Sequence, residues 1–406
     1  MKIVFFSNFL NHHQLPLCKE LVENKDVEFT FVATEPIPQD RLEMGYADMN
    51  KTYDFVLRAY ESGDFKRKAE DLAKNCDVMI FGSAPLSYLD LRMSENRLTF
   101  YFCERVLRKG YWRRFIPMTH KKIYNAYLRY KDKPLYILGA SAYTSYDLKL
   151  CGFNEKKCFK WGYFPDVRAK GIHSLLEQKK CNNAVEILYA GRLLHLKNVI
   201  DTVKALNILV NKNIKKFHFT IIGDGVQKHK IEAYIQAQSL QEYIDILPFM
   251  PSEEVRRHMD KADIYVFGSN FYEGWGAVVN EAMDSACAMV VSHAVGSAPY
   301  LIKNGENGLI YSCGNIRQLA DILQQLIVDK DYREKISVNG YDTITNEWTP
   351  KIAAERLLKL SEALNDNFEN NGVFESGICS LAKPLNNNWI KNKENIKCHF
   401  SQTKHC

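Results

Sequence analysis

The sequence predicts an α/β protein built from two successive doubly wound, Rossmann-like domains that face each other across an interdomain cleft. Two observations support this fold class. Short, continuously apolar segments alternate with amphipathic segments of helical period along most of the chain, which is typical of parallel strands covered by helices on both faces. The chain also has 406 residues, of which 46% are hydrophobic, and this length favours two domains with sizeable cores.

The first series of apolar segments lies in residues 1–176, which we expect to form the N-terminal domain. The strands that we expect there are residues 3–6, 27–32, 78–81, 98–102 and 135–138. Each segment is short and lacks the polar alternation of a half-exposed strand. We therefore expect one parallel sheet that is buried between two layers of helices.

The second series begins after a polar stretch at residues 177–183, which is the best linker candidate in the chain. It occupies residues 184–347, the expected C-terminal domain. Its expected strands are residues 185–189, 217–222, 244–247, 264–267, 288–291 and 309–311, with helical patterns such as 199–209 and 231–240 between them. Because ligands of doubly wound sheets bind at the carboxyl ends of the strands, we look for function in the loops that follow them.

Two further segments follow the second domain. Residues 348–364 have the pattern of one more amphipathic helix, which we expect to pack back toward the N-terminal domain. Residues 365–406 are rich in Asn and Lys and show little apolar periodicity. We expect these residues to form a polar tail that is either mobile or a species-specific appendage.

Charge, cysteine usage and apolar run length exclude several classes of protein. The net charge of +6 is small for this length and no recognition motif accompanies it, so we expect no nucleic-acid partner. The 11 cysteines include no Cys-x-x-Cys arrangement, which indicates a reducing compartment rather than disulfides or a zinc site. No apolar run reaches the length of a signal peptide core or a membrane span. We expect a cytoplasmic protein, with any membrane contact peripheral and at the inner face.

The most informative segment follows the expected strand at 264–267 and contains two glutamates, Glu273 and Glu281. Gly274 and Gly276 argue against one continuous helix through both. We expect Glu273 in a loop and a helix that starts near Gly276 and carries Glu281. A carboxylate there can accept hydrogen bonds from the two adjacent hydroxyls of a ribose, while N–H groups at the helix start can bind phosphate.

The stretch Glu-Gly-Trp-Gly-Ala-Val-Val-Asn-Glu-Ala-Met at 273–283 resembles the acidic pair of the retaining glycosyltransferases of family four. Residues 190–198, 222–225 and 305–310 also occur in that family's order and spacing, so the resemblance covers the C-terminal half. The resemblance implies the GT-B fold of two Rossmann-like domains. It implies transfer of a sugar from a nucleotide-diphosphate-sugar donor to an acceptor hydroxyl, in bacterial surface polysaccharide or lipid-linked glycan biosynthesis.

The resemblance also implies roles for single residues. Glu281 is expected to hold the nucleotide ribose, and Glu273 to contact or orient the donor sugar. Arg192 and Lys197 follow the first strand of the second domain, where two cations can bind the diphosphate leaving group; the alternative for Arg192 is a structural ion pair. The other expected donor-binding residues are Gly191, Gly223, Gly274, Trp275, Gly276, Gly296 and Ser297.

A metal ion is not required in this scheme, because the two cations already stabilise the departing diphosphate. Asp329 and Asp331 have the spacing of a metal-binding pair, but they separate two helical patterns. We interpret Asp329 as a helix N-cap instead. No cofactor is expected beyond the sugar nucleotide itself, which is a substrate.

The N-terminal half matches the family less well. The loop after the first expected strand contains His12 and His13, which are candidates for contact with the diphosphate or the acceptor hydroxyl. Helix-entry residues are the alternative interpretation. The loop at residues 81–85 lies where many relatives place a histidine, and this chain has none there.

A basic stretch at residues 105–133 is the other informative feature. Together with Glu104 it contains ten Lys or Arg and only two acidic residues, interleaved with six aromatic residues. This mixture suits an anionic membrane surface or a phosphate-bearing lipid acceptor. The alternative is an ordinary solvated helix face with core aromatics.

Two other functions remain open at this point. The same architecture can carry a sugar-nucleotide epimerase, which acts on the donor without an acceptor. It can also carry a non-catalytic subunit that binds a nucleotide sugar without turnover.

Overall fold

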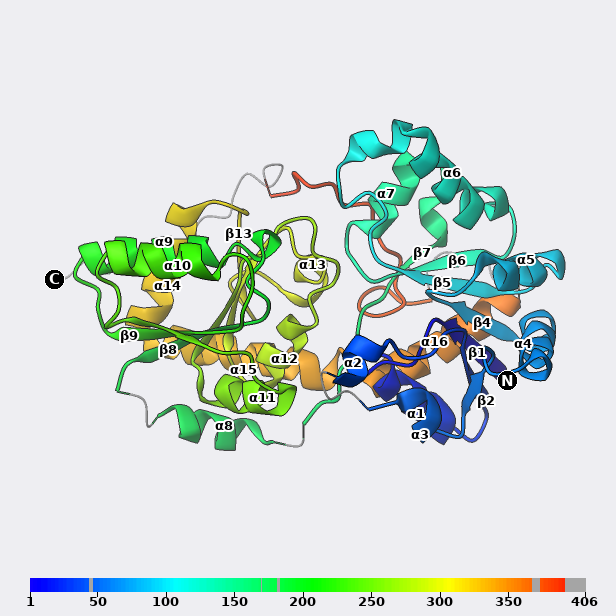
Figure 1. The fold of residues 1–406 in the computed structure, drawn as a ribbon, viewed down its shortest axis with the longest axis horizontal. Helices are drawn as coiled ribbons and strands as arrows, with labels where there is room; N and C mark the ends of the chain where they lie inside the picture. Colours follow the sequence, from blue (N-terminus) through cyan, green and yellow to red (C-terminus); the bar gives the residue numbers. More distant parts are fainter. Residues whose placement is uncertain (44–46, 169, 181–182, 367–372, 391–406) are drawn as a thin grey trace.

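The computed structural model describes residues 1–43, 47–168, 170–180, 183–366 and 373–390. Within these residues the chain forms two all-parallel sheets, each covered by helices on both faces (Figure 1). The N-terminal sheet has the strand order β3-β2-β1-β4-β5-β6-β7, and the C-terminal sheet has the order β10-β9-β8-β11-β12-β13. Two doubly wound domains were predicted, and the structure confirms them.

The N-terminal domain contains every strand that the sequence predicted, plus two more at the sheet edges. Its strands are β1 (Lys2–Ser7), β2 (Glu28–Ala33), β3 (Val56–Arg58), β4 (Val78–Phe81), β5 (Thr99–Cys103), β6 (Leu135–Gly139) and β7 (Cys158–Lys160). Its helices are α1 (Leu15–Glu23), α2 (Gln39–Glu43), α3 (Met49–Thr52), α4 (Gly63–Asn75), α5 (Leu86–Ser94), η1 (Tyr111–Phe115), α6 (Pro117–Ala126), η2 (Leu128–Tyr130), α7 (Thr144–Leu150) and η3 (Glu155–Lys157). The edge strands β3 and β7 were missed because three residues are too few to show a pattern.

The C-terminal domain follows the same plan. Its strands are β8 (Val185–Ala190), β9 (Phe217–Ile222), β10 (Ile244–Leu247), β11 (Ile264–Phe267), β12 (Ala288–Ser292) and β13 (Leu309–Tyr311). Its helices are α8 (Ile172–Lys179), η4 (His195–Lys197), α9 (Val199–Asn211), α10 (Lys228–Ala237), α11 (Ser252–Lys261), α12 (Val278–Asp284), α13 (Ala298–Leu301), α14 (Ile316–Val328) and α15 (Lys330–Asn346). The strand order reverses between β8 and β11, so the loops after these two strands meet at the switch point where ligands bind.

The structure differs from the predicted linker at residues 177–183 and agrees with the predicted helix cap at Asp329. Helix α8 occupies the first part of the expected linker at 177–183 and packs against α11 and α15, so the second domain begins earlier than residue 184. Its Lys179 ammonium donates to the backbone oxygen of Met259, which ties the helix to that domain. By contrast, Asp329 is the N-cap of α15 as predicted, because its side chain accepts a hydrogen bond from Tyr332 N at 2.9 Å.

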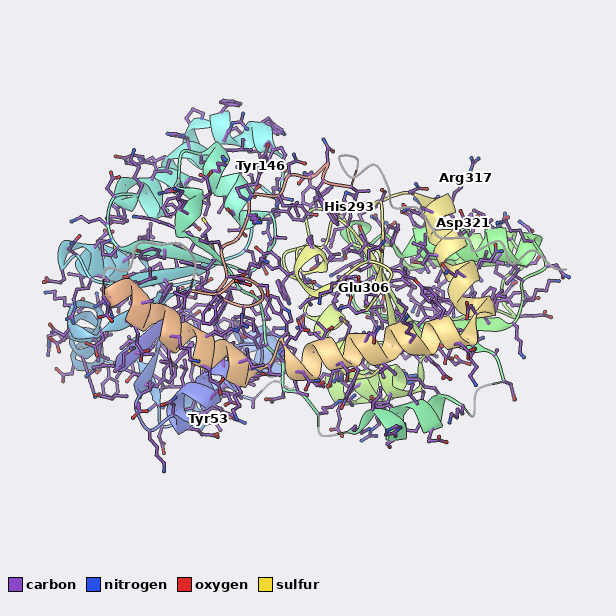
Figure 2. The ribbon with its side chains drawn as sticks, turned by 180° about the vertical axis from the view of Figure 1, so that it is seen from behind. Tyr53, Tyr146, His293, Glu306, Arg317 and Asp321 are labelled. Carbon is purple, nitrogen blue, oxygen red and sulfur yellow. The ribbon has the colours of Figure 1, made fainter. Side chains whose placement is uncertain are left out.

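The C-terminal segments return to the N-terminal domain. Figure 2 shows α15 and α16 (Pro350–Asn365) end to end along one face of the molecule, with α15 on one domain and α16 on the other. Helix α16 packs against α1. Among the helices that the structure describes, none combines the length and the hydrophobicity needed to cross a bilayer.

The described part of the polar tail, residues 373–390, is packed rather than free. Cys379 N donates to Lys160 O of β7 at 2.9 Å, and Lys160 N donates to Ser380 O at 2.8 Å. Ile378 and Cys379 are fully buried. The expectation of a mobile appendage is therefore wrong for these residues, because main-chain pairing with a sheet edge needs no apolar periodicity. Residues 391–406 lie outside the described part.

Candidate active site

Two loops of the C-terminal domain come together at the switch point of its sheet. Lys197, at the end of η4, follows β8, and Glu273 lies in the loop between β11 and α12. Lys197 Nζ lies 2.5 Å from Glu273 Oε2, and each side chain is 15% exposed. The ammonium also lies 4.9 Å from the centre of the Phe267 ring. Two residues predicted from separate motifs are thus in direct contact at the carboxyl edge of the sheet.

Glycines let the loops after β8 and β9 approach each other closely. Gly191 and Gly223 have φ angles of 147° and 145°, which side chains rarely allow. A Cβ atom on Gly223 would lie 2.1 Å from Gly191 O. Their N–H groups already donate to Ile222 O and Leu247 O. Both glycines therefore shape the loop, and their predicted contact with the donor stays a prediction.

Arg192 is exposed at the start of the loop after β8. Its guanidinium makes no hydrogen bond or ion pair with any residue in the described part of the chain, so the alternative of a structural ion pair is not seen. Its backbone oxygen accepts a hydrogen bond from the Tyr189 hydroxyl at 3.1 Å, which anchors the residue to β8. An exposed planar cation in the loop that leads to Lys197 can bind an anion.

Glu281 lies on α12, which begins at Val278, close to the predicted start at Gly276. Its carboxylate has no hydrogen-bond partner among the residues described. Burial raises the pKa of this carboxyl, and the nearby Arg256 only partly offsets that rise. Hydrogen-bond donors from a ligand would favour the ionised form, and the two hydroxyls of a ribose are donors of this kind.

The loop that carries Glu273 is held from behind by the loop after β12. Gly296 N donates to Gly274 O at 3.0 Å, and Ser297 N donates to Trp275 O at 3.1 Å. Gly276 has a φ of 80°, and a Cβ atom there would lie 2.8 Å from the Phe267 ring. The predicted role of Gly296 and Ser297 as donor contacts is untested; in the structure their N–H groups fasten this loop.

The side chain of Trp275 is buried rather than open to a ligand. Its side chain is 1% exposed, and its Nε1 donates to Asn280 Oδ1 at 2.9 Å. A Cβ atom on Gly162, in the segment that links the domains, would lie 2.4 Å from the Trp275 ring. The Trp275 side chain therefore packs between the domains, and the predicted contact of this residue with the donor stays a prediction.

Glu104 is a site residue that sequence reasoning missed. It directly follows β5, and it accepts a hydrogen bond from the Tyr163 hydroxyl at 3.2 Å. A Cβ atom on Gly274 would lie 2.0 Å from Glu104 Oε2, so the carboxylate touches the donor-side loop of the other domain. Burial raises the pKa of Glu104, and the nearby charge of Glu273 adds to the rise. Glu104 could have been predicted from its place directly after an expected strand. From the sequence it was considered only as one of the two acidic residues of the basic stretch.

The two histidines lie on the N-terminal side of the same region. The His13 ring is 5.4 Å from the Tyr163 ring, and the His12 ring is 3.9 Å from the His13 ring. Asn11 Oδ1 accepts from His13 N at 3.0 Å, just before α1 begins. This bond holds the turn that precedes α1, and both interpretations of the two histidines stay predictions.

A cavity of about 640 Å³ opens in the N-terminal domain at the carboxyl ends of β1, β4 and β5. Its wall mixes polar and apolar side chains, and one side is formed by α6. Its lining includes Asn8, Asn11, Gln14, Ser83, Glu104, Lys122 and Asn125. Glu104 joins this cavity to the loop of Glu273, so the cavity adjoins the site built by the C-terminal domain.

Residues 175–343 match the family of glycosyl transferases group 1. The alpha-D-kanosaminyltransferase of Streptomyces kanamyceticus is 26% identical over 171 residues, which are 42% of this chain and 44% of that protein. The GalNAc-alpha-(1->4)-GalNAc-alpha-(1->3)-diNAcBac-PP-undecaprenol alpha-1,4-N-acetyl-D-galactosaminyltransferase of Campylobacter jejuni is 27% identical over 180 residues, 44% of this chain and 48% of that protein. The match thus spans less than half the length of each of these relatives.

Solved structures resemble the whole fold. HepE of Anabaena in complex with UDP has a TM-score of 0.66 at 15% identity, over 89% of this chain and 100% of that chain. A glycosyltransferase of Rickettsia africae has a TM-score of 0.64 at 17% identity, over 90% of this chain and 99% of that chain. These likenesses confirm the predicted GT-B fold.

The segment that matches glycosyl transferases group 1 contains only part of the site. Arg192, Lys197, Glu273 and Glu281 lie inside it, whereas Glu104 and the cavity lie outside it. The positions of Arg192, Lys197, Glu273 and Glu281 thus fall within the matched segment, whereas Glu104 and the cavity are placed by geometry alone.

Proposed function

We propose that the protein is a retaining glycosyltransferase that transfers a sugar from a nucleotide-diphosphate-sugar donor to an acceptor hydroxyl. We place this reaction in bacterial surface polysaccharide or lipid-linked glycan biosynthesis. The observation that carries the proposal is the pairing of Lys197 with Glu273, together with the exposed Arg192 in the loop that leads to Lys197, within the segment that matches glycosyl transferases group 1. Relatives whose names specify alpha-glycosyl transfer support retention.

The donor side follows from charge. Arg192 and Lys197 bind the diphosphate of the donor, the first through a planar fork and the second as a compact charge. Glu281 accepts hydrogen bonds from the ribose hydroxyls. Glu273 holds the Lys197 ammonium in place and contacts the donor sugar. The positive charges are arranged before the reaction begins, so they need little reorganisation as the leaving group gains charge.

The transfer step needs no covalent nucleophile in this scheme. The acceptor hydroxyl attacks the anomeric carbon from the face that the diphosphate leaves. The bond from that carbon to the phosphate oxygen breaks as the bond to the acceptor oxygen forms, and the departing phosphate oxygen takes up the hydroxyl proton. Closure of the two domains excludes water, which would otherwise hydrolyse the donor.

We assign the acceptor to the cavity of the N-terminal domain. The polar side chains in its lining suit a sugar head group, and Glu104 stands between the cavity and the loop of Glu273. A carboxylate in that position can accept a hydrogen bond from the attacking hydroxyl. His12 and His13 remain candidates for contact with the diphosphate or with the acceptor.

The surface beside the cavity suits a lipid-linked acceptor. On η1 and α6, Trp112, Phe115 and Met118 are 62–73% exposed. Arg113, Arg114, Lys121 and Lys122 lie among them. Arg105 is not part of this surface, which corrects the predicted stretch at 105–133: it is buried and paired with Asp147. We propose peripheral contact between this basic-aromatic surface, residues 108–124, and an anionic membrane at its inner face.

The test of the function uses purified protein, a panel of sugar nucleotides and a bacterial lipid extract. We expect nucleotide diphosphate release together with labelled sugar in the lipid phase, and retained anomeric configuration by NMR of the product. An inverted product would refute retention. A donor that isomerises alone without release would indicate an epimerase, and binding without turnover would indicate a non-catalytic subunit.

A cavity lysine provides a matched test of the acceptor site. Lys122 lines the cavity, whereas Lys121, its neighbour on α6, does not. We expect Lys122→Ala to raise the KM for the lipid acceptor about tenfold, the value of one charge-assisted hydrogen bond, with the donor KM unchanged. Lys121→Ala should have a smaller effect. Equal effects of the two changes would argue against the cavity as the acceptor site.

A second exposed residue tests the membrane contact. Phe115→Ser is expected to weaken binding to vesicles of phosphatidylglycerol and phosphatidylcholine about 10- to 100-fold, because a buried phenyl ring contributes about 1.5–3 kcal/mol. Cosedimentation measures this. Phe65, an exposed phenylalanine on α4, serves as the control position. If Phe65→Ser lowers vesicle binding as much as Phe115→Ser, the basic-aromatic surface is not the contact.

A further inference from the structure

The C-terminal segment at residues 373–390, here called the strap, is anchored on the N-terminal domain. It pairs with β7, the edge strand of that sheet, through three main-chain hydrogen bonds. Cys379 N donates to Lys160 O, Lys160 N donates to Ser380 O, and Ala382 N donates to Cys158 O, at 2.8–2.9 Å. The strap therefore covers a sheet edge that would otherwise be open.

The far end of the strap reaches the other domain through Asn387. Its Oδ1 accepts hydrogen bonds from Arg105 Nη1 at 3.1 Å and from the Tyr111 hydroxyl at 2.8 Å. Its main-chain oxygen lies 3.2 Å from His293 Nε2, at the end of β12 in the C-terminal domain. His293 Nδ1 accepts from Cys313 N at 2.9 Å, so Nε2 carries the hydrogen and donates to Asn387. Asn387 thus joins the two domains.

Trp389 makes a second connection across the same boundary. Its Nε1 donates to the Tyr143 hydroxyl at 2.9 Å, and that hydroxyl donates in turn to the main-chain oxygen of His293. Tyr143 belongs to the N-terminal domain and is fully buried. Figure 2 shows His293 where the two domains meet, next to the end of the strap.

These contacts lie beside the candidate active site. The Arg105 guanidinium, held by Asp147 Oδ1 at 2.9 Å, lies 5.7 Å from the ring of Phe271, which belongs to the loop of Glu273. Arg105 is also the direct neighbour of Glu104. Asn387 therefore accepts a hydrogen bond from Arg105, a buried cation. Arg105 lies next to Phe271 in the loop of Glu273, and it directly follows Glu104 in the chain.

We infer that the strap holds the two domains in the arrangement seen here and that Asn387 and Trp389 are its positioning residues. They act through Arg105, Tyr143 and His293 rather than by touching substrate. Direct contacts such as Ala142 N to Gly296 O at 2.9 Å remain without the strap. Loss of a strap contact therefore lowers the population of this domain arrangement and does not separate the domains.

The test measures the distance between the domains in the full chain. Spin labels on genetically encoded residues at Asp64 on α4 and His229 on α10, both exposed, report on it by double electron–electron resonance. Asn387→Leu keeps a similar volume but removes the side-chain hydrogen bonds to Arg105 and Tyr111, which hold residue 387 so that its main-chain oxygen meets His293. Asn388→Leu is the matched control, because the Asn388 side chain is exposed. Trp389→Phe keeps a ring but loses the indole donor.

We expect Asn387→Leu and Trp389→Phe to add a population of longer distances, while Asn388→Leu matches the unmodified chain. The donor KM is expected to rise three- to tenfold in the first two variants, with a larger share of donor lost to water. Unchanged interdomain distances in both variants would contradict the inference that the strap holds the two domains together. Because the distances are measured without nucleotide, this outcome is separate from a failure of the proposed function, which appears as absence of turnover in the unmodified chain.

Discussion

Replacing Arg192 by alanine is expected to lower kcat for sugar transfer about 100- to 1,000-fold, the usual cost of removing one preorganised charge-stabilising group. The guanidinium is exposed and makes no ion pair with the described residues, so its removal leaves no buried charge and should not unfold the loop. Steady-state kinetics with the donor found in the panel measures kcat and KM separately. The donor KM should change far less than kcat, because the charge on the diphosphate grows as the bond breaks.

Two further variants sharpen this test. Arg192→Lys keeps the charge but loses the planar fork, so it should recover only part of the rate. His195→Ala changes an exposed residue of the same loop, whose Nε2 lies 3.0 Å from Gln227 Nε2, and should keep most of the activity. A near-normal kcat in Arg192→Ala would show that another group bears the charge of the leaving diphosphate.

Replacing Glu281 by alanine is expected to raise the Kd for nucleotide about 10- to 100-fold, because hydrogen bonds to a charged group contribute about 1.5–3 kcal/mol. Calorimetry with the nucleoside diphosphate of the donor found in the panel measures this. The unmodified protein should lose a similar factor for the 2′-deoxy nucleotide. The Glu281→Ala variant should bind both nucleotides alike, and a preserved preference for the ribose form would contradict the assignment.

The pH dependence of binding provides an independent check on Glu281. Burial raises the pKa of its carboxyl, so the charged form is lost at a higher pH than for an exposed glutamate. Nucleotide affinity should therefore fall as the pH is lowered through that raised pKa. Glu281→Gln cannot titrate and should lack this part of the dependence, while the titration of the phosphate affects both proteins equally.

Sequence reasoning succeeded where the signal is local. The strand segments were predicted because a strand buried on both faces is a short apolar run, and β8 and β11 show such runs clearly. The loop positions of Arg192, Lys197 and Glu273 then followed, since parallel strands end at one edge of the sheet. Asp329 was correctly interpreted as a helix cap because capping involves neighbours in the chain.

Sequence reasoning failed where the signal is distant. The burial of the Trp275 side chain was not predicted, because it depends on Gly162, more than a hundred positions away. Glu104 acquires its place only when the N-terminal domain meets Gly274. The strap pairs with β7 through its main chain, and this pairing needs no apolar periodicity in the side chains. The sequence pattern therefore did not reveal it.

The sequence alone therefore determined the two doubly wound domains and the loops that carry the donor-side residues, because strand burial and helical period repeat along the chain itself. Only the tertiary structure decided that Lys197 contacts Glu273, that Glu104 faces the donor loop and that Asn387 reaches His293. Each of these contacts joins residues far apart in the chain, and their approach depends on how whole elements pack, for which no local pattern exists.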